Sequence, residues 1–387
     1  MQEKIRGSNI EVKKINRNQT FRYINKYEKV SKPDICYGLG ISMPTVLQNV
    51  AELMEKGLIC EIGAFESTGG RKAKIIAPVH NARYAIGIDI TQNHIGLVLT
   101  DLSGKVLKHT RQHKPFINEK KYFKELGEMA VMFLGDSNIP ENKFLGFGIS
   151  VPGIVMPGNE KFIFSYALNI INTPCSIFSQ FIPYPCIFTN DANAAGIAEM
   201  FSEEKQFNAV YLSLSNSVGG TIILDKSCSL NGNQVSENIF SGDNYRSGEF
   251  GHMTLKPGGK DCYCGKKGCV DAYCSAKNLS ILTNEKLEIF FEELEHGNNE
   301  FEKNWEEYLS NLAIAVNNLR MAFDCSVIIG GYVGSFIEPY LTRLQEEAAA
   351  LNTFEMNAQY IKPCRFKIEA SAMGAALRQI ELFINSI

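Results

Sequence analysis

The stretch Ala85-Ile86-Gly87-Ile88-Asp89-Ile90 sets the fold class of this chain. Its nearly continuous apolar character is typical of a β-strand that is buried on both faces. Residues 94–100 and 105–108 read as further strands around a Ser103-Gly104 turn, which predicts a meander. A helix is predicted next, over about residues 119–134. A buried strand followed by a meander and a helix indicates an α/β body.

Strands and helices keep alternating after this first unit. Further strands are predicted at residues 144–151, 187–189, 209–214, 221–224 and 327–331. A final helix is predicted over residues 371–383, and no internal repeat is visible. The chain has 387 residues, whereas a single core rarely grows past about 250–300 residues, so two or three domains are expected.

The composition is that of a globular protein. Hydrophobic residues make up 45% and charged residues 21% of the chain, which argues against a largely disordered protein. No apolar run approaches the roughly 20 residues that span a bilayer, and residues 1–6 lack the apolar core of a signal peptide. We therefore expect a cytoplasmic protein without a membrane contact. Its 11 cysteines are expected to be thiols or metal ligands rather than disulfides.

The net charge of −3 is unevenly distributed. Residues 1–80 contain 13 lysines and arginines against 8 acidic residues, a balance of +5, and the remainder carries −8. A basic amino-terminal part on an acidic body is compatible with a nucleic-acid contact at one end, although such a balance is common.

The first 80 residues are predicted to be a helix-turn-helix followed by a wing. Helices are predicted at about residues 16–27, from Ser31, and from Ser42 to Lys56, before short strands at 58–62 and 73–77. The third helix would turn its polar face to the major groove of DNA, and the glycine-rich hairpin tip would enter a narrow minor groove. A three-helix packing module with a solvated hairpin tip fits the same pattern. The predicted DNA-binding residues are Arg17, Ser42, Thr45, Gln48, Asn49, Arg71 and Lys72.

His252, Cys262, Cys264 and Cys269 follow the spacing H-x9-C-x-C-x4-C. Four nitrogen and sulfur ligands suit a tetrahedral Zn²⁺, and a complete set leaves no open position for catalysis. The prediction is one structural zinc ion per chain, and a reduced, metal-free cysteine loop is the alternative. Cys274 is left out because the tetrahedral set is already full.

Three motifs resemble the ROK family, whose name stands for repressor, open reading frame and kinase. Residues 248–252 match the family's GExGH motif, residues 262–269 match its CxCGxxGC motif, and residues 190–193 match the segment that carries the general base of the kinases. The resemblance covers nearly the whole chain, and the amino-terminal winged helix-turn-helix matches only the repressor branch. It implies a two-lobed actin-like (ribonuclease H-like) sugar-kinase fold behind that module.

The resemblance also implies a sugar pocket. His252 would bind a sugar hydroxyl through one ring nitrogen while the other holds zinc, because the metal fixes the tautomer. The family usually has glutamate two residues after the last zinc cysteine, where this chain has the shorter Asp271. The implied sugar-binding residues are Asn190, Asp191, Glu249, His252 and Asp271.

The segments that would bind ATP depart from the kinase pattern. ROK kinases carry a DxGG-type turn and a GTGxGGG-like loop, where this chain has Asp89-Ile90-Thr91-Gln92-Asn93 and Ser215-Asn216-Ser217-Val218-Gly219-Gly220. Phosphates are cradled by the backbone N–H groups of such glycine-rich loops, so we expect no enzyme activity. Gly330-Gly331 still resembles the nucleotide-side turn. Asp191, the base of the kinases, would then only accept a hydrogen bond from the sugar.

The expected function is that of a sugar-responsive transcriptional repressor. A homodimer or tetramer would bind a palindromic operator in double-stranded DNA, and a sugar between two α/β lobes would shift the DNA affinity. Residues 248–254 and 273–279 are most similar to the xylose-repressor branch, so a pentose is the first candidate and a glucose-type hexose the second. The alternatives are a repressor controlled by a protein partner, an active sugar kinase, and a zinc-stabilised DNA-binding protein with an empty pocket.

The predicted domains are a DNA-binding domain, a smaller lobe and a larger lobe that carries the zinc loop. An insertion at residues 230–246, rich in Asn, Ser and Gly, is interpreted as a surface loop or a pocket lid. The domain bounds are residues 1–80, residues 81–192 with 371–387, and residues 193–370.

Overall fold

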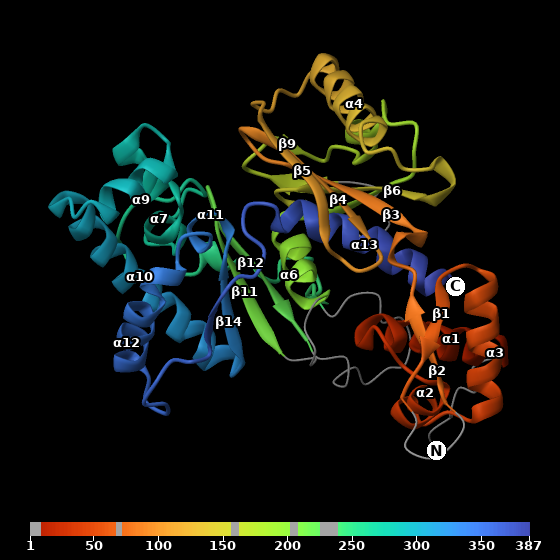
Figure 1. Cartoon of the computed structure of the whole chain (residues 1–387). Coiled ribbons are helices and arrows are strands. Elements are labelled where there is room, and N and C mark those ends of the chain that lie inside the picture. The colour runs from red at the N-terminus through yellow and green to blue at the C-terminus, as the bar shows by residue number, and fades with distance from the viewer. Residues whose placement is uncertain (1–8, 67–71, 156–161, 202–207, 225–238) are drawn as a thin grey trace, which may run out of the picture.

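Two five-stranded sheets and a small amino-terminal helical module make up the molecule (Figure 1). The computed structural model describes residues 9–66, 72–155, 162–201, 208–224 and 239–387. Among these residues, no helix combines the length and the apolar character that crossing a membrane requires.

The amino-terminal module contains three helices and an antiparallel pair of strands, in the predicted order. Its elements are α1 (Asn9–Tyr27), α2 (Lys32–Leu39), α3 (Met43–Glu55), β1 (Ile59–Ala64) and β2 (Lys74–Pro78). Ser31 and Asp34 form a capping box at the start of α2, and Ser42 caps α3. Gly40 ends α2 with a left-handed φ of 63°. The caps that were predicted from the sequence therefore fix the two helices and the turn between them.

The first sheet contains the strand from which the fold class was predicted. Its strands are β3 (Tyr84–Ile90), β4 (His94–Asp101), β5 (Val106–His113), β6 (Phe144–Val151) and β10 (Cys186–Asn190). Their order across the sheet is β10-β6-β3-β4-β5, with β3, β6 and β10 parallel and β3-β4-β5 an antiparallel meander. Strand β3 is covered on both faces, since Ile88 packs under α4 (Lys120–Gly135) and Ala85 packs against α13 (Ala370–Ser386).

The second sheet repeats this topology. Its strands are β11 (Ala209–Leu214), β12 (Val218–Ile223), β13 (Ile239–Phe240), β14 (Ser326–Gly330) and β15 (Ile361–Pro363). The order β13-β12-β11-β14-β15 again joins an antiparallel three-stranded part to a parallel part. The repeat was not visible in the sequence because the strand order, and not the residues, is duplicated.

Helices α10 (Asn299–Phe323) and α12 (Leu341–Leu351) pack on the second sheet, and α9 (Leu287–Glu295) packs on α10. The smaller elements are β7 (Ile154–Val155), β8 (Phe162–Ser165), β9 (Ile170–Ile171), α5 (Ser176–Ser179), α7 (Asp271–Cys274), α8 (Lys277–Ser280) and α11 (Gly331–Gly334).

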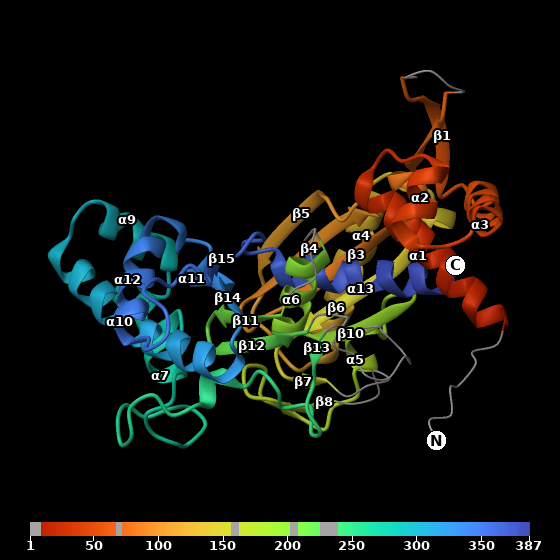
Figure 2. The ribbon, with the colours of Figure 1, turned by 90° about the horizontal axis from the view of Figure 1, so that it is seen from below.

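Helices α13 and α6 (Asp191–Phe201) pack against each other between the two sheets (Figures 1 and 2). Helix α13 lies on β3 and β6, and α6 contacts β11 and β12. The approach is close, because a Cβ at Gly87 would lie 1.7 Å from the carbonyl oxygen of Ala372. Only glycine at this position of β3 leaves room for α13.

The carboxyl-terminal end of α13 packs against the amino-terminal module, as both views show (Figures 1 and 2). The guanidinium of Arg22 on α1 donates to both carboxylate oxygens of Glu381, at 2.8 and 2.6 Å, and to Asn385 Oδ1 at 3.0 Å. Ile380 belongs to the same hydrophobic core as Phe21 of α1. The last helix of the chain is therefore part of the interface with the first.

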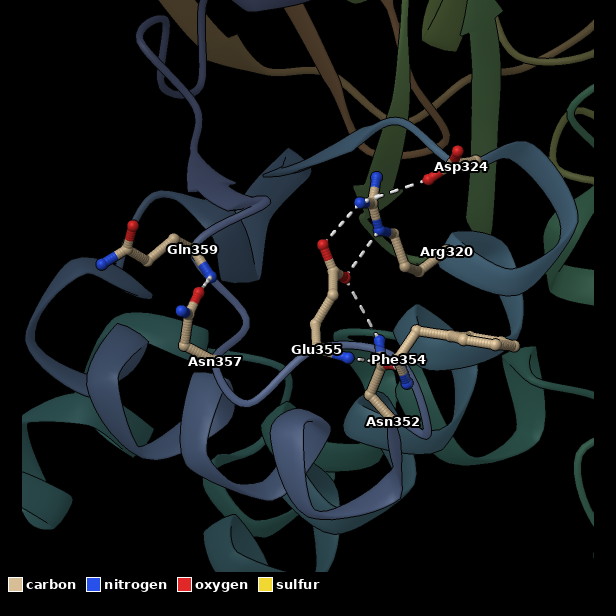
Figure 3. Close-up of polar contacts among 7 residues, drawn as sticks. All are labelled: Arg320, Asp324, Asn352, Phe354, Glu355, Asn357 and Gln359. Carbon is tan, nitrogen blue, oxygen red and sulfur yellow. Dashed lines mark hydrogen bonds and ion pairs between the residues drawn. The ribbon is translucent and has the colours of Figure 1, made fainter.

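A polar network fixes the loop after α12 (Figure 3). Arg320 on α10 donates from Nη2 to Glu355 Oε1 at 2.6 Å and from Nε to Glu355 Oε2 at 2.9 Å. Asn352 Oδ1 accepts from the backbone N–H groups of Phe354 and Glu355. Because the ion pair between Arg320 and Glu355 is bidentate, it holds the loop in one geometry.

Candidate functional site

A cavity with two neighbouring chambers lies between residues of the two sheets. The first chamber has a volume of about 580 Å³ and the second about 330 Å³, both within the range of small-molecule sites. Tyr166, Asp191 and Tyr263 are among the residues that line both chambers, so the two chambers lie next to each other. Four of the five predicted sugar-binding residues line the first chamber, namely Asn190, Asp191, Glu249 and His252.

Asn190 and Asp191 stand where β10 ends and α6 begins. Asn190 Oδ1 accepts from the backbone N–H of Asn193 at 2.9 Å, and its Nδ2 donates to Gly153 O and Asp191 Oδ1, both at 3.0 Å. Asp191 Oδ1 also accepts from the N–H of Ala192 at 2.9 Å. Since both amide hydrogens of Asn190 are already used, its side chain positions Asp191, whose second carboxylate oxygen remains available to a ligand.

Two carboxylates lie deep in the cavity. Burial, and after it the charge of Asp89, raise the pKa of Asp191 to about 7, against a hydrogen bond from the Ala192 N–H that lowers it. Burial also raises the pKa of Asp89 to about 6, although the Ser150 hydroxyl donates to it at 2.9 Å. A fraction of Asp191 is therefore protonated at neutral pH, and it can both donate and accept a hydrogen bond.

Glu249 and His252 come from the short turn of the GExGH motif. Burial raises the pKa of Glu249, and the nearby Arg246 opposes this shift. The two ring nitrogens of His252 face different partners, with Nδ1 3.9 Å from Cys262 Sγ and Nε2 3.4 Å from the Tyr263 hydroxyl. One side of the imidazole thus faces the cysteine cluster and the other faces the chamber.

Four potential metal ligands come together as predicted, with one ligand atom of each residue within 4.8 Å of the others. They are His252, Cys262, Cys264 and Cys269. The Cys264 and Cys269 sulfurs are 3.8 Å apart, and a tetrahedral ion with metal–sulfur bonds near 2.3 Å requires about 3.8 Å. Gly268 makes the tight turn possible, because a Cβ there would lie 1.8 Å from the carbonyl oxygen of Lys256. The donor set and its spacing could therefore hold a metal ion.

Asp271 does not reach the cavity, which corrects its assignment to the sugar. Its side chain is 5% exposed, and Oδ1 accepts from the backbone N–H of Val218 at 2.6 Å. The carboxylate joins α7 to the start of β12, and it lines neither chamber. The aspartate side chain, one methylene shorter than the glutamate usual in the family, is therefore bound to the Val218 N–H.

Several cavity residues were missed by the sequence analysis. Arg246 and Arg378 line the first chamber, and Arg378 Nη1 donates to the carbonyl of Phe188 at 2.9 Å. Tyr166 and Tyr263 pack edge to face, with ring centroids 5.3 Å apart. The place of Tyr263 within the C-x-C motif could have indicated its proximity to the pocket, whereas Tyr166 and Arg378 carry no local signal. Arg246 belongs to the insertion, whose residues 230–238 lie outside the described residues.

The second chamber is lined by residues of the segments that depart from the kinase pattern in the sequence. Asp89 lines it from the end of β3, and Thr91 and Gln92 line it from the β3–β4 turn. The backbone N–H of Gly331, in the turn that resembles the nucleotide site, donates to the hydroxyl of Tyr211 at 3.2 Å. This amide is thus already engaged within the protein.

Of the predicted DNA-binding residues, one is buried, and the others lie at the surface or outside the described residues. Asn49, which was predicted to lie on the exposed face of α3, is 5% exposed and donates to the Thr20 hydroxyl at 2.9 Å. That assignment was wrong because Asn49 stands three residues after Val46 and four before Leu53, on the buried stripe. The apolar Leu47, by contrast, is 47% exposed.

The other predicted DNA-binding residues lie at the surface or outside the described residues. Ser42 and Gln48 are exposed and Thr45 is half-buried, all on the outer side of α3. Arg17 pairs with Glu52, to which Gln48 Nε2 also donates at 2.9 Å. Lys72 is exposed beside the hairpin tip, and Arg71 lies outside the described residues.

Comparison with known proteins identifies relatives over the whole chain. The xylose repressor of Bacillus spizizenii is 28% identical and aligns over 97% of both chains. The DNA-binding transcriptional dual regulator NagC of Escherichia coli is 25% identical over 70% of this chain and 64% of its own.

Solved structures share the fold. A ROK family transcriptional regulator, a homologue of the E. coli MLC protein, superposes with a TM-score of 0.75 at 19% identity and covers 97% of this chain and 98% of its own. A ROK family glucokinase from Streptomyces griseus, solved with glucose and AMPPNP, gives a TM-score of 0.60 at 20% identity over 76% of this chain and 98% of its own. The two-lobed architecture is therefore the actin-like fold of ROK sugar kinases. The model of the ROK family matches residues 85–380, and the chain belongs to the ROK family.

Proposed function

We propose that this chain is a sugar-responsive transcriptional repressor, whose amino-terminal module binds operator DNA and whose first chamber binds the sugar that changes the DNA affinity. One observation carries the proposal: α13 joins a cavity of hydroxyl-binding groups to a separate helical module within one chain. The name of the B. spizizenii relative, which aligns over 97% of both chains, supports this function and favours a pentose over a hexose.

The amino-terminal module would be a winged helix-turn-helix that places α3 in the major groove. Gln48 would read a base edge, and the exposed Leu47 would contact a thymine methyl group. Ser42 and Thr45 stand in the first turn of α3, the part of a recognition helix that reaches the bases. Two copies of the chain would bind the two halves of a palindrome as a homodimer.

The sugar would bind between the two lobes. Asp191, Glu249 and His252 would contact its hydroxyls, while Asn190 holds Asp191 in place. A structural zinc on His252 and the three cysteines would keep the imidazole oriented toward the sugar. We keep the domain bounds proposed from the sequence, in which the last helix, residues 371–387, belongs to the smaller lobe together with residues 81–192.

Helix α13 would carry the signal from the sugar to the DNA-binding module. Ser371, at its start, donates to the carbonyl of Asp191 at 3.1 Å, and Arg378 lines the first chamber. Glu381 and Asn385, one and two turns further on, hold Arg22 of α1. A sugar that moves one lobe would therefore displace α1, provided that it binds the two lobe arrangements with different affinities.

The test is sequence selection from random double-stranded DNA with the full chain, followed by titration at several salt concentrations. We expect specific binding with a steep salt dependence, because lysines and arginines replace counterions on the phosphates. Gln48→Ala should change the preferred sequence, and the exposed Gln180→Ala should not. Failure to select any sequence would contradict the proposal, and an unchanged preference in Gln48→Ala would remove α3 as the reading helix.

A sugar kinase is the second candidate, and the raised pKa of Asp191 favours it, since a general base works best near the operating pH. It ranks second because the Gly331 N–H is engaged by Tyr211 and the β3–β4 turn has no glycine pair. Sugar-dependent ATP hydrolysis or transfer that is lost in Asp191→Asn would establish the kinase activity.

A further inference from the structure

The second chamber has no role in the function proposed so far. It adjoins the first, and Asp191, Ser213 and Tyr263 belong to the walls of both. At about 330 Å³, it lies at the lower end of the volumes of small-molecule sites. A ligand in the first chamber therefore lies beside a second space of molecular size.

Part of the lining of the second chamber consists of uncharged hydrogen-bonding side chains from both lobes. Thr91 and Gln92 come from the β3–β4 turn, and Ser215 and Asn216 come from the β11–β12 turn. Hydroxyl and amide groups can each donate and accept, which matches the hydroxyls of a sugar. The ring of Tyr332 adds an apolar surface on which C–H groups can pack.

The charges of the second chamber do not favour a nucleotide. Two carboxylates, Asp89 and Asp191, stand in the same lining as two ammonium groups, Lys277 and Lys367, so the chamber presents no cluster of cations alone. Lys277 Nζ lies 3.5 Å from Gln92 Oε1, and Lys367 Nζ lies 3.8 Å from a carboxylate oxygen of Glu338.

A nucleoside triphosphate needs cations and unengaged backbone N–H groups around its phosphates. The N–H of Gly331 is already donated to Tyr211, so the best candidate for such a cradle is occupied. A neutral, polyhydroxylated ligand can bind to this lining without additional cations.

We propose that the second chamber is a subsite for a second, uncharged sugar ring, and that the preferred effector is a disaccharide with one ring in each chamber. The inference rests on the proposed function, because it requires a sugar in the first chamber. The link between the two rings would pass Asp191, which stands at the junction, and Tyr166 and Tyr263 would frame the passage.

The experiment is calorimetric titration of the full chain with xylose, xylobiose, glucose, cellobiose, maltose, inorganic phosphate and AMPPNP with Mg²⁺. One disaccharide should bind at least about tenfold more tightly than its own monosaccharide, since even one net hydrogen bond of about 1.4 kcal/mol gives a factor of ten. Phosphate and AMPPNP should give no heat of binding above buffer.

Two variants test whether the additional affinity for the disaccharide comes from the second chamber. Asn216→Trp should fill the second chamber and reduce the ratio of disaccharide to monosaccharide affinity to about one, while the monosaccharide affinity stays unchanged. Gln92→Ala is the milder variant and should reduce that ratio several-fold. Gln359→Ala, an exposed glutamine beyond α12, is the matched control and should leave the ratio as in the unmodified chain.

Two results would overturn the inference and leave the proposed function intact. The first is that a monosaccharide binds and every disaccharide binds no more tightly than its monosaccharide. The second is that AMPPNP binds and loses its affinity in Asn216→Trp. If no saccharide binds although the chain binds its selected DNA, the sugar part of the proposed function fails as well.

Discussion

Replacing Asp191 by asparagine should make the stability of the protein less dependent on pH. Asparagine keeps an oxygen that can accept from the Ala192 N–H and the Asn190 amide, but it removes a carboxyl that is costly to ionise where it lies. The chief cause of that cost is burial, and the charge of Asp89 adds to it.

The magnitude follows from the pKa of Asp191, which is raised from 3.8 to about 7 in the folded protein. Between these two values the folded state keeps a proton that the unfolded state has lost. The free energy of unfolding therefore falls as the pH rises, until the folded protein also ionises at about pH 7. Each pH unit in this window is worth about 1.4 kcal/mol, so from pH 5 to pH 8 the unmodified chain should lose about 3 kcal/mol through this group.

The assay is urea unfolding at pH 5 and pH 8, followed by the fluorescence of Trp305, which is the only tryptophan and is buried among Phe291, Tyr308 and Tyr340. The free energy of unfolding of the unmodified chain should fall by about 3 kcal/mol more than that of Asp191→Asn when the pH is raised from 5 to 8. Asp136→Asn, at the exposed end of α4, is the matched control and should show the same fall as the unmodified chain. Equal pH dependence of Asp191→Asn and the unmodified chain would refute the argument that burial holds the proton on Asp191.

Three further substitutions test the metal site, the helix contact and the loop. Cys264→Ser should lower the zinc content from one ion per chain to none, as measured by elemental analysis, and should also lower the midpoint of thermal unfolding, because the four-ligand set is broken. Glu381→Gln removes a charge from the bidentate pair with Arg22 and should reduce the effect of sugar on DNA affinity about fivefold, while sugar affinity measured by calorimetry stays the same. Arg320→Ala should lower the free energy of unfolding by about 1 kcal/mol, because Glu355 loses a bidentate partner that is only 16% exposed.

Each of these substitutions has a control and a result that would count against it. Cys60→Ser, a half-buried cysteine outside the cluster, should keep the zinc, and full zinc in Cys264→Ser would remove this cysteine from the site. If sugar changes the DNA affinity of Glu381→Gln as much as that of the unmodified chain, the contact between α13 and α1 does not transmit the effect of the sugar. Arg343→Ala breaks a more exposed ion pair and should cost less than Arg320→Ala, so the reverse order would contradict the role of the network.

The sequence was sufficient for features that depend on local patterns. Residues 144–151 and 209–214 are strands with the predicted bounds, because each is an apolar run bounded by polar or glycine-containing turns. The metal-ligand cluster was found because its three cysteines lie within one short loop. Strand β5 was predicted too short, since its outer half, residues 109–113, is polar and lies at the edge of the sheet.

Features that depend on distant contacts could not be predicted. The pairing of Arg22 with Glu381 joins residues 359 positions apart, and no local pattern marks either of them. Asn49 was misplaced because its polarity was given more weight than its position on the buried stripe of α3. The Asp271 carboxylate was assigned to the sugar by resemblance, whereas its contact with the Val218 N–H appears only once the chain is folded.

The central claim is that sugar binding and DNA binding are coupled within one chain. Fluorescence anisotropy of the selected operator duplex, titrated with the full chain with and without a saturating sugar that calorimetry has shown to bind, tests it most directly. We predict that the sugar changes the Kd for DNA by at least about tenfold, which is a coupling free energy of about 1.4 kcal/mol. A Kd that stays the same within a factor of about two, with the sugar bound, would contradict the account.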